Sequence, residues 1–168
     1  MSDSVLSRIG RAAKMATVGA IRTAGDVGEA VVESTRDVVC TALDGVTDVT
    51  TTAFKSVAEI VKGAVHAAAD VGSDVGKTTQ KAVRGAVKGA HETGADVGKA
   101  AVAAVRGSIE AVQEVGGDTT KALQNAVTGA LDAAGEISEK ATEAVADALS
   151  SSVQGAKEVV QSTYKKKE

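Results

Sequence analysis

The sequence has no proline and no tryptophan, and it holds only one tyrosine, one phenylalanine and one cysteine in 168 residues. Hydrophobic residues make up 43% of the chain but aromatic residues only 1%, so alanine and valine dominate the apolar content. Aromatic, leucine and isoleucine side chains normally supply most of the area buried in a core. The composition therefore predicts no compact globular core, and it argues against an enzyme; we expect no catalytic residues.

Other classes are excluded by the scarcity of cysteine, histidine and basic charge. Cys40 has no partner for an internal disulfide, and two histidines do not complete a metal site with it, so we expect no metal, no cofactor and a reducing, cytoplasmic setting. A net charge of −3 lacks the basic excess of a nucleic-acid binder. A mean hydropathy near zero, +0.04, is too apolar for a solvated disordered chain.

Long uncharged apolar runs are also missing. One of the cleanest, 122–131, contains Gln124, Asn125 and Thr128, so no segment is predicted to cross a bilayer. The segment 1–25 is basic, with apolar residues at roughly helical spacing, and in this it resembles an organellar targeting sequence. Because the same pattern continues down the chain, we interpret it as the first part of a repeat.

A 22-residue repeat organises the chain. Asp74-Val-Gly-Lys77, Asp96-Val-Gly-Lys99 and Asp118-Thr-Thr-Lys121 recur at that spacing, and each is followed in register by Ala-Val-x-Gly. The register divides the chain into a head at 1–7, seven units at 8–161 and a basic tail at 162–168. Counted from the first residue of each unit, position 19 is always acidic: Asp26, Asp48, Asp70, Glu92, Glu114, Glu136 and Glu158.

The repeat length matches the pitch of an α-helix. Twenty-two residues are twice eleven, and eleven residues in three turns give about 3.67 residues per turn. Positions 2, 3, 6, 10, 13, 14, 17 and 21 then share one side of a helix, which predicts an all-α protein of long amphipathic helices. The predicted apolar binding face comprises Val83, Val87, Val97, Ala101, Val105, Ile109, Val112, Leu123, Val127 and Leu131.

Two arrangements of the helices fit this pattern. Thr93-Gly-Ala-Asp96 and Val115-Gly-Gly-Asp118 resemble a glycine C-terminal stop followed by an Asp N-cap, which predicts a hairpin at each unit. Against breaks at every unit, glycine recurs equally often in mid-unit, as at Gly85 and Gly107, and the apolar phase continues across the boundaries. We favour long helices, extended or folded back once or twice near Gly72 or Gly116, with hairpins at each unit as the alternative.

Motifs for chemistry are weak. The stretch from Gly72 to Thr78 approaches a phosphate-binding loop, but the first glycine is one residue too close and Lys77 belongs to the repeat. His66 and His91 occupy different unit positions and are best interpreted as exposed helix residues. Basic and acidic residues lean to opposite sides of the polar arc, so that a basic flank fits either anionic headgroups or the acidic flank of a neighbouring helix.

The segments 115–131 and 76–87 resemble the eleven-residue repeats of synucleins and of the perilipin lipid-droplet proteins, which mix Val, Thr, Gly, Ala and Lys on a weakly apolar face. The likeness covers nearly the whole chain, although the Lys-Thr-Lys-Glu-Gly-Val box is not present and Asp replaces many expected Lys. It implies reversible binding to a lipid surface, with folding on contact.

The balance between burial free energy and ordering cost favours a protein that needs a partner surface. A unit offers about four side chains of Val, Ile or Leu size, at roughly 1.5 kcal/mol each when buried, against about 1 kcal/mol of ordering cost per residue. We therefore expect a non-enzymatic coat on a lipid, droplet or granule surface, peripheral to it, with no small-molecule substrate and no nucleic acid as partner. Its expected headgroup contacts are Arg8, Arg11, Lys14, Arg22, Lys165, Lys166 and Lys167.

Two alternatives remain. One is a self-associating, coiled-coil-like structural protein, a homo-oligomer formed by helix pairing in which Ala and Gly permit close contact. The other is a stress protectant similar to late embryogenesis abundant proteins, which also use eleven-residue periods but are typically far more charged.

Overall fold

A computed structural model describes residues 2–24, 28–44 and 51–167. These residues form helices and no strand, which confirms the all-α prediction. The helices are α1 (Ser2–Ala24), α2 (Glu29–Leu43), α3 (Thr51–Asp70), α4 (Val75–Glu92), α5 (Val97–Glu114), α6 (Thr119–Ile137), α7 (Glu139–Ser152) and α8 (Ala156–Lys167).

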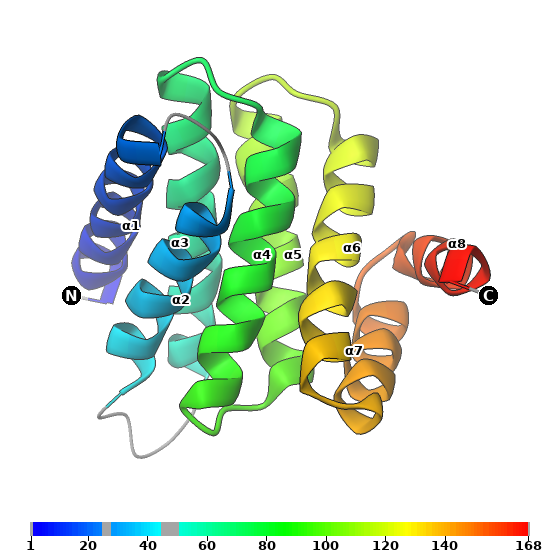
Figure 1. The fold of residues 1–168 in the computed structure, drawn as a ribbon. Helices are drawn as coiled ribbons and strands as arrows, with labels where there is room; N and C mark the ends of the chain where they lie inside the picture. The colour runs from blue at the N-terminus through cyan, green and yellow to red at the C-terminus, as the bar shows by residue number, and fades with distance from the viewer. Residues whose placement is uncertain (1, 25–27, 45–50, 168) are drawn as a thin grey trace.

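The helices stack in two layers, and from α1 to α7 successive helices run in opposite directions (Figure 1). One layer holds α1, α3, α5 and α7, and the other holds α2, α4 and α6, with α8 set across the end of the stack (Figure 1). From α1 to α7, helices two apart in the chain pack more extensively than successive helices do. The chain therefore forms a compact helical array, and the expectation that it lacks a compact core is wrong.

Each central unit contributes one helix, because a turn and a cap recur at its boundaries. Gly72, Gly94 and Gly116 have φ of 69°, 78° and 77°, a left-handed conformation that glycine adopts without a side-chain clash. The amide of the following residue closes each turn onto a carbonyl five residues earlier, as Ala95 does to Ala90 at 2.9 Å. The interpretation with a hairpin at each unit holds, and uninterrupted helices across these boundaries do not occur.

The mid-unit glycines have a different role, which explains why they recur without making turns. At position 12 of their units, Gly63, Gly85, Gly107 and Gly129 are buried against the backbone of the helix two earlier in the chain. A Cβ built at Gly107 would lie 2.6 Å from the carbonyl oxygen of Ala58. Glycine at position 12 thus lets helices two units apart approach until their backbones nearly touch.

Every central helix consequently buries two faces. The valine-rich stripe expected from the helical wheel is one of them. The other, which we call the small-residue face, consists of positions 5, 9, 12 and 16 of a unit, for example Ala100, Ala104, Gly107 and Ala111, all of which are buried. Alanine and valine together make up most of the described core, so the array is held by close backbone packing of small side chains.

The seventh unit departs from this pattern. Ser138 ends α6 and caps α7 at once, its hydroxyl accepting a hydrogen bond from the amide of Ala141 at 3.0 Å. The chain then breaks again around Gly155, whose φ is 83°, so this unit spans α7 and the beginning of α8. Residues 2–7 of the expected head lie in α1, and residues 162–167 of the expected tail continue α8.

The contact at position 12 predicts opposite effects of one substitution at two sites. Gly107→Ala should lower the free energy of unfolding by about 1–3 kcal/mol, because the methyl group would overlap the backbone of α3. Gly19→Ala, at position 12 of α1, meets nothing within 4 Å and should raise it by about 0.5–1 kcal/mol through better helix propensity. Urea unfolding of both variants measures this, and equal effects would contradict the close-contact role.

Candidate functional site

The residues predicted to form an apolar binding face lie mostly inside the array. Seven of them, Val83, Val87, Ala101, Val105, Val112, Val127 and Leu131, are buried, and Val97, Ile109 and Leu123 are half-buried. All except Val112 belong to or pack against the largest core cluster, and Val112 lies in a smaller one. Folding therefore covers the stripe with other units of the same chain, and little of it faces outward.

The basic residues predicted to contact lipid headgroups differ in their exposure and pairing. Arg8, Arg11 and Arg22 are exposed on α1. Lys14 pairs instead with Asp70 of α3, with Nζ 2.5 Å from Oδ2. Lys165, Lys166 and Lys167 end α8, and their side chains lie outside the described residues.

Ion pairs join helices two apart along both layers, and position 19 supplies an acidic residue to them in each layer, namely Glu114 and Glu136. In one layer Lys62 Nζ lies 3.0 Å from Glu114 Oε1 and 3.1 Å from Glu110 Oε1. In the other, Arg84 pairs with Glu136, and Lys88 Nζ lies 2.7 Å from Glu136 Oε2. Between helices of the same layer, the basic and acidic flanks seen in the sequence thus pair inside the molecule.

These contacts shift the carboxylate pKa values. Hydrogen bonding from Lys62 lowers the pKa of Glu114, and hydrogen bonding from Lys88 lowers the pKa of Glu136. Burial disfavours the charged form of Lys62, yet its hydrogen bonds to Glu114 and Glu110 leave its pKa raised. The pairs are partly solvated, so each contributes modestly to stability.

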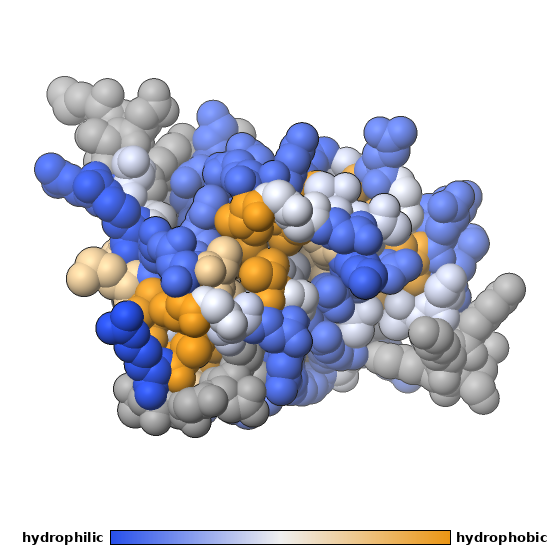
Figure 2. All heavy atoms as spheres, turned by 90° about the horizontal axis from the view of Figure 1, so that it is seen from above, coloured by the Kyte–Doolittle hydropathy of each residue, from blue (hydrophilic) through white to orange (hydrophobic). Residues whose placement is uncertain are grey.

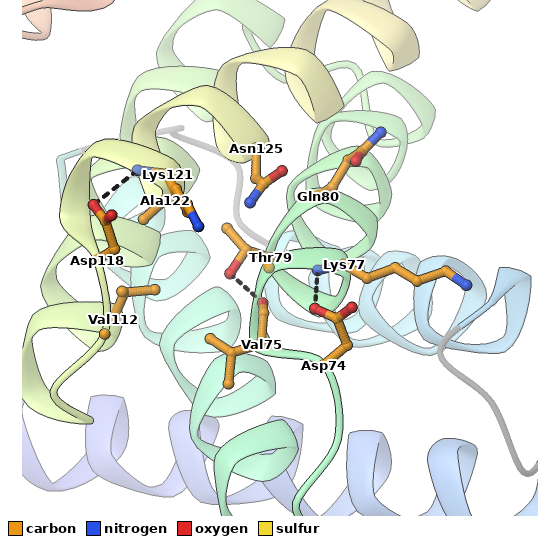
Figure 3. Close-up of a pocket in the computed structure, with 12 residues that line it drawn as sticks. Asp74, Val75, Lys77, Thr79, Gln80, Val112, Asp118, Lys121, Ala122 and Asn125 are labelled. Carbon is orange, nitrogen blue, oxygen red and sulfur yellow. Dashed lines mark hydrogen bonds between the residues drawn. The ribbon is translucent and has the colours of Figure 1, made fainter.

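A cleft of about 500 Å³ lies between the N-terminal ends of α4 and α6 (Figure 3). Asp74 and Asp118 cap these helices: Asp74 Oδ1 accepts from the amide of Lys77 at 3.0 Å, and Asp118 Oδ1 from that of Lys121 at 3.2 Å. Lys121 and Asn125 lean toward the gap between the helices, while the Lys77 side chain extends away from it (Figure 3).

This cleft includes much of the stretch that approaches a phosphate-binding loop. In such a loop the free backbone amides face the phosphate. Here the amide of Lys77 is taken by Asp74, whose carboxylate also repels an anion. The turn and cap that end one unit and begin the next account for this cluster.

The histidines and the cysteine have local roles. His66 Nε2 lies 3.0 Å from Glu114 Oε2, beside the Lys62 pair, and is partly buried rather than freely exposed. His91 is exposed near the end of α4, as expected. Burial, followed by its hydrogen bond to Glu92, raises the pKa of the Cys40 thiol to about 11, so the thiol stays protonated and weakly nucleophilic near neutral pH.

At the two ends of the array, surfaces are exposed that in the central helices are covered by a neighbouring helix. On α1, positions 5 and 12, Ala12 and Gly19, are exposed, although the same positions are buried in α3, α4, α5 and α6. Met15 lies between them with 75% of its surface exposed. At the other end, a groove of about 790 Å³ lies between α6 and α8, lined by Leu123 and Gln124 of α6 among others.

A third surface lies where α1, α3 and α5 end. Apolar side chains reach the surface there among hydrophilic ones (Figure 2). Val71, Val75 and Val115 are half-buried at these helix ends, and Lys77 and Lys121 lie in the first turns of α4 and α6 on the same side. None of the helices in the described parts of the chain is long and apolar enough to span a membrane.

Sequence reasoning missed the small-residue face and therefore the contact between helices two apart. Its signal was present: a small residue recurs at positions 5, 9, 12 and 16 in the fourth to sixth units, as in Ala122, Ala126, Gly129 and Ala133. A pattern of small residues has little hydrophobic contrast, so a wheel that seeks one apolar stripe overlooks it.

Comparison with protein-family models, with curated proteins and with solved structures found no match. The resemblance to synuclein and perilipin repeats therefore stays a prediction.

The lowered carboxylate pKa values set the pH dependence of stability. A carboxylate whose folded pKa lies below its unfolded value stabilises the fold above the unfolded pKa, and this contribution is lost as pH falls through the folded pKa. The melting temperature should therefore be nearly level between about pH 7 and 5 and fall below about pH 4.5.

Glu136→Gln tests this dependence. It should lower the melting temperature at pH 7, and its difference from the unmodified protein should be much smaller at pH 3, because Glu136 becomes protonated as pH falls. Glu143→Gln, at an exposed site on α7, is the matched control and should leave the profile unchanged. A constant difference at both pH values, measured by circular dichroism melts, would show that the Glu136 pairs do not set the acid dependence.

Proposed function

We propose that this chain is a non-enzymatic structural protein that folds on its own and self-associates through the faces by which its helices stack. The observation that carries the proposal is the recurrence of one contact: position-12 glycine against backbone, between α1 and α3, α2 and α4, α3 and α5, and α4 and α6. A contact that is used four times in one chain is well suited to join chains, because stacked repeats contact only their neighbours and need special ends to stop.

The folded state supports self-association over a coat that folds on contact with lipid. The weak stripe of each unit is buried against other units, so the chain supplies the partner surface that a single unit lacks. Ion pairs between helices of one layer, such as Lys62 with Glu114 and Lys88 with Glu136, give the charged side chains beside these contacts a partner within the same chain. Association of copies adds further surface of the same kind.

A lipid or granule coat is the second candidate, and one observation favours it. Val71 follows the end of α3, Val75 begins α4 and Val115 follows the end of α5; all three are half-buried on the side of the array where apolar side chains reach the surface (Figure 2). Lys77 and Lys121 lie in the first turns of α4 and α6 on the same side. Apolar side chains flanked by lysines suit shallow insertion into an anionic lipid surface. A stress protectant that gains helix on drying remains a prediction that no contact of the array favours.

Circular dichroism combined with light scattering separates these functions. A structural protein should be largely helical in dilute buffer without lipid, and its mean mass should rise with protein concentration between about 1 and 500 µM, the range of weak homotypic contacts. A helical chain that stays monomeric throughout this range would overturn self-association.

Anionic vesicles of phosphatidylglycerol and phosphatidylcholine supply the second arm. A coat should co-float with these vesicles, and Val71→Glu combined with Val115→Glu should abolish flotation because both changes place charge in the apolar region. Ala144→Glu, at an exposed site on α7, is the control. A chain that is unstructured without vesicles would contradict independent folding and would instead support a coat that folds on contact with lipid.

A further inference from the structure

We propose that copies of this chain associate head to tail, with the open small-residue face of α1 from one copy docking in the groove between α6 and α8 of the next. This inference rests on the proposed self-association and specifies its two surfaces and its polarity. Four observations lead to it: the open half of an interface on α1, a polar end on α2, a matching groove on α6, and complementary charge.

The first observation is the exposure of α1. In α3 to α6 the residue at position 5 is buried, as are the glycines at position 12, because each covers a helix two earlier in the chain. No helix precedes α1 in its layer among the described residues. Ala12 and Gly19 are therefore exposed, nothing lies within 4 Å of a Cβ built at Gly19, and Met15 projects between them.

The second observation is the contrast with α2, which is also first in its layer. Its residue at position 12 is Thr41 and its residue at position 8 is Asp37, and both are exposed. Terminal repeats of soluble arrays carry such polar outer faces to prevent further stacking. On α1 the corresponding residues are Gly19 and Met15, which are the small and apolar types suited to a covered contact.

The third observation is the groove at the opposite end. In the internal contacts, position 12 of one helix meets positions 3 or 7 of the helix two earlier, as Gly107 meets Ala58 and Gly129 meets Gln80. On α6, positions 3, 6, 7 and 11 are Thr120, Leu123, Gln124 and Thr128, and all four line the groove of about 790 Å³. The contact of α8 with α6 is far less extensive than that of α6 with α4, so this half of the interface is only partly covered.

The fourth observation is charge. Helix α1 carries Arg8, Arg11 and Arg22 on its exposed surface. Among the described residues, the charged side chain that lines the groove is that of Glu158 on α8. The neighbouring helix α7 exposes Glu139, Glu143 and Asp147 together with Lys140, and α8 also exposes Lys157. The Glu158 carboxylate in the groove favours the approach of the α1 arginines, and these arginines disfavour the approach of two α1 faces.

The geometry specifies a parallel packing of the two helices. Within the array, Gly10 meets Gly63 and Lys14 meets Asp70, so helices two apart run in the same direction at a nearly constant offset. If α1 of a second copy follows α6 with the register in which Gly129 meets Gln80, its Gly19 lies over Gln124. Because the two surfaces differ, such an association is heterologous and continues into chains of molecules instead of closing as a two-fold dimer.

Two single substitutions block the two halves separately. Gly19→Gln adds a long side chain to an open face and should weaken self-association at least about tenfold without harming the monomer fold. Thr41→Gln, at the same unit position on α2, is the matched control and should have no effect. Gln124→Trp should fill the groove on α6 and weaken association to a similar degree. Light scattering measures mass, and circular dichroism confirms the fold of each variant.

Mixing the two blocked variants tests polarity. Gly19→Gln retains an intact groove, and Gln124→Trp retains an intact α1 face, so each should be monomeric alone while the mixture forms a dimer and nothing larger. A mixture that stays monomeric would overturn the head-to-tail arrangement. It would also be overturned if Gly19→Gln abolished self-association while Gln124→Trp left it intact, because that result indicates two α1 faces in contact.

A disulfide tests the register. In a Cys40→Ser background, a Gly19→Cys variant mixed with a Gln124→Cys variant should form a mixed disulfide under mild oxidation, whereas Thr41→Cys with Gln124→Cys should not. If the unmodified protein stays monomeric, the proposed function fails together with this inference. If it associates and Gly19→Gln associates equally well, or if α8 closes the groove so that Gln124→Trp has no effect, only the head-to-tail inference fails.

Discussion

The close approach of helices two units apart is the constraint on which the rest of the structure depends. Alanine and valine bury little apolar area each, so contact between them stabilises a fold only when many atoms meet at short range. Glycine at position 12 permits this by removing the Cβ that would otherwise hold two backbones apart, as at Gly107 over Ala58. A composition that is poor in large side chains therefore becomes compatible with a compact array.

The turns serve the same constraint. Helices two apart can stack in parallel only if every unit reverses the chain, and a left-handed glycine followed by an Asp cap makes that reversal in four residues between α4 and α5. Position 19 lies just before the turn, and from there its carboxylate reaches the lysine or arginine of the helix two earlier. Turn, glycine contact and ion pair thus recur together because one geometry generates all three.

The same regularity shapes the functional proposals. An array built from equivalent steps presents an uncovered step at each end unless a terminal helix differs in sequence. Helix α2 differs, with Thr41 in place of glycine, and α7 and α8 together replace a regular seventh step. Helix α1 keeps the residues of an internal step, and this is why its surface, more than the capped cleft near Asp74, is the feature from which a function can be argued.

The 22-residue period, the helical class, the valine stripe and the signals for turn and cap at Gly94 and Asp96 were all legible in the amino-acid sequence, because each depends on residues near one another in the chain. The choice between a long helix and a hairpin at every unit could not be made from the sequence. A mid-unit glycine such as Gly85 argues against breaks until the second helix that packs against it is known. Contacts between residues about fifty positions apart, such as Lys62 with Glu114, depend on which faces meet. Only the tertiary structure decided this, because small side chains carry too little hydrophobic contrast to mark a second buried face in the sequence.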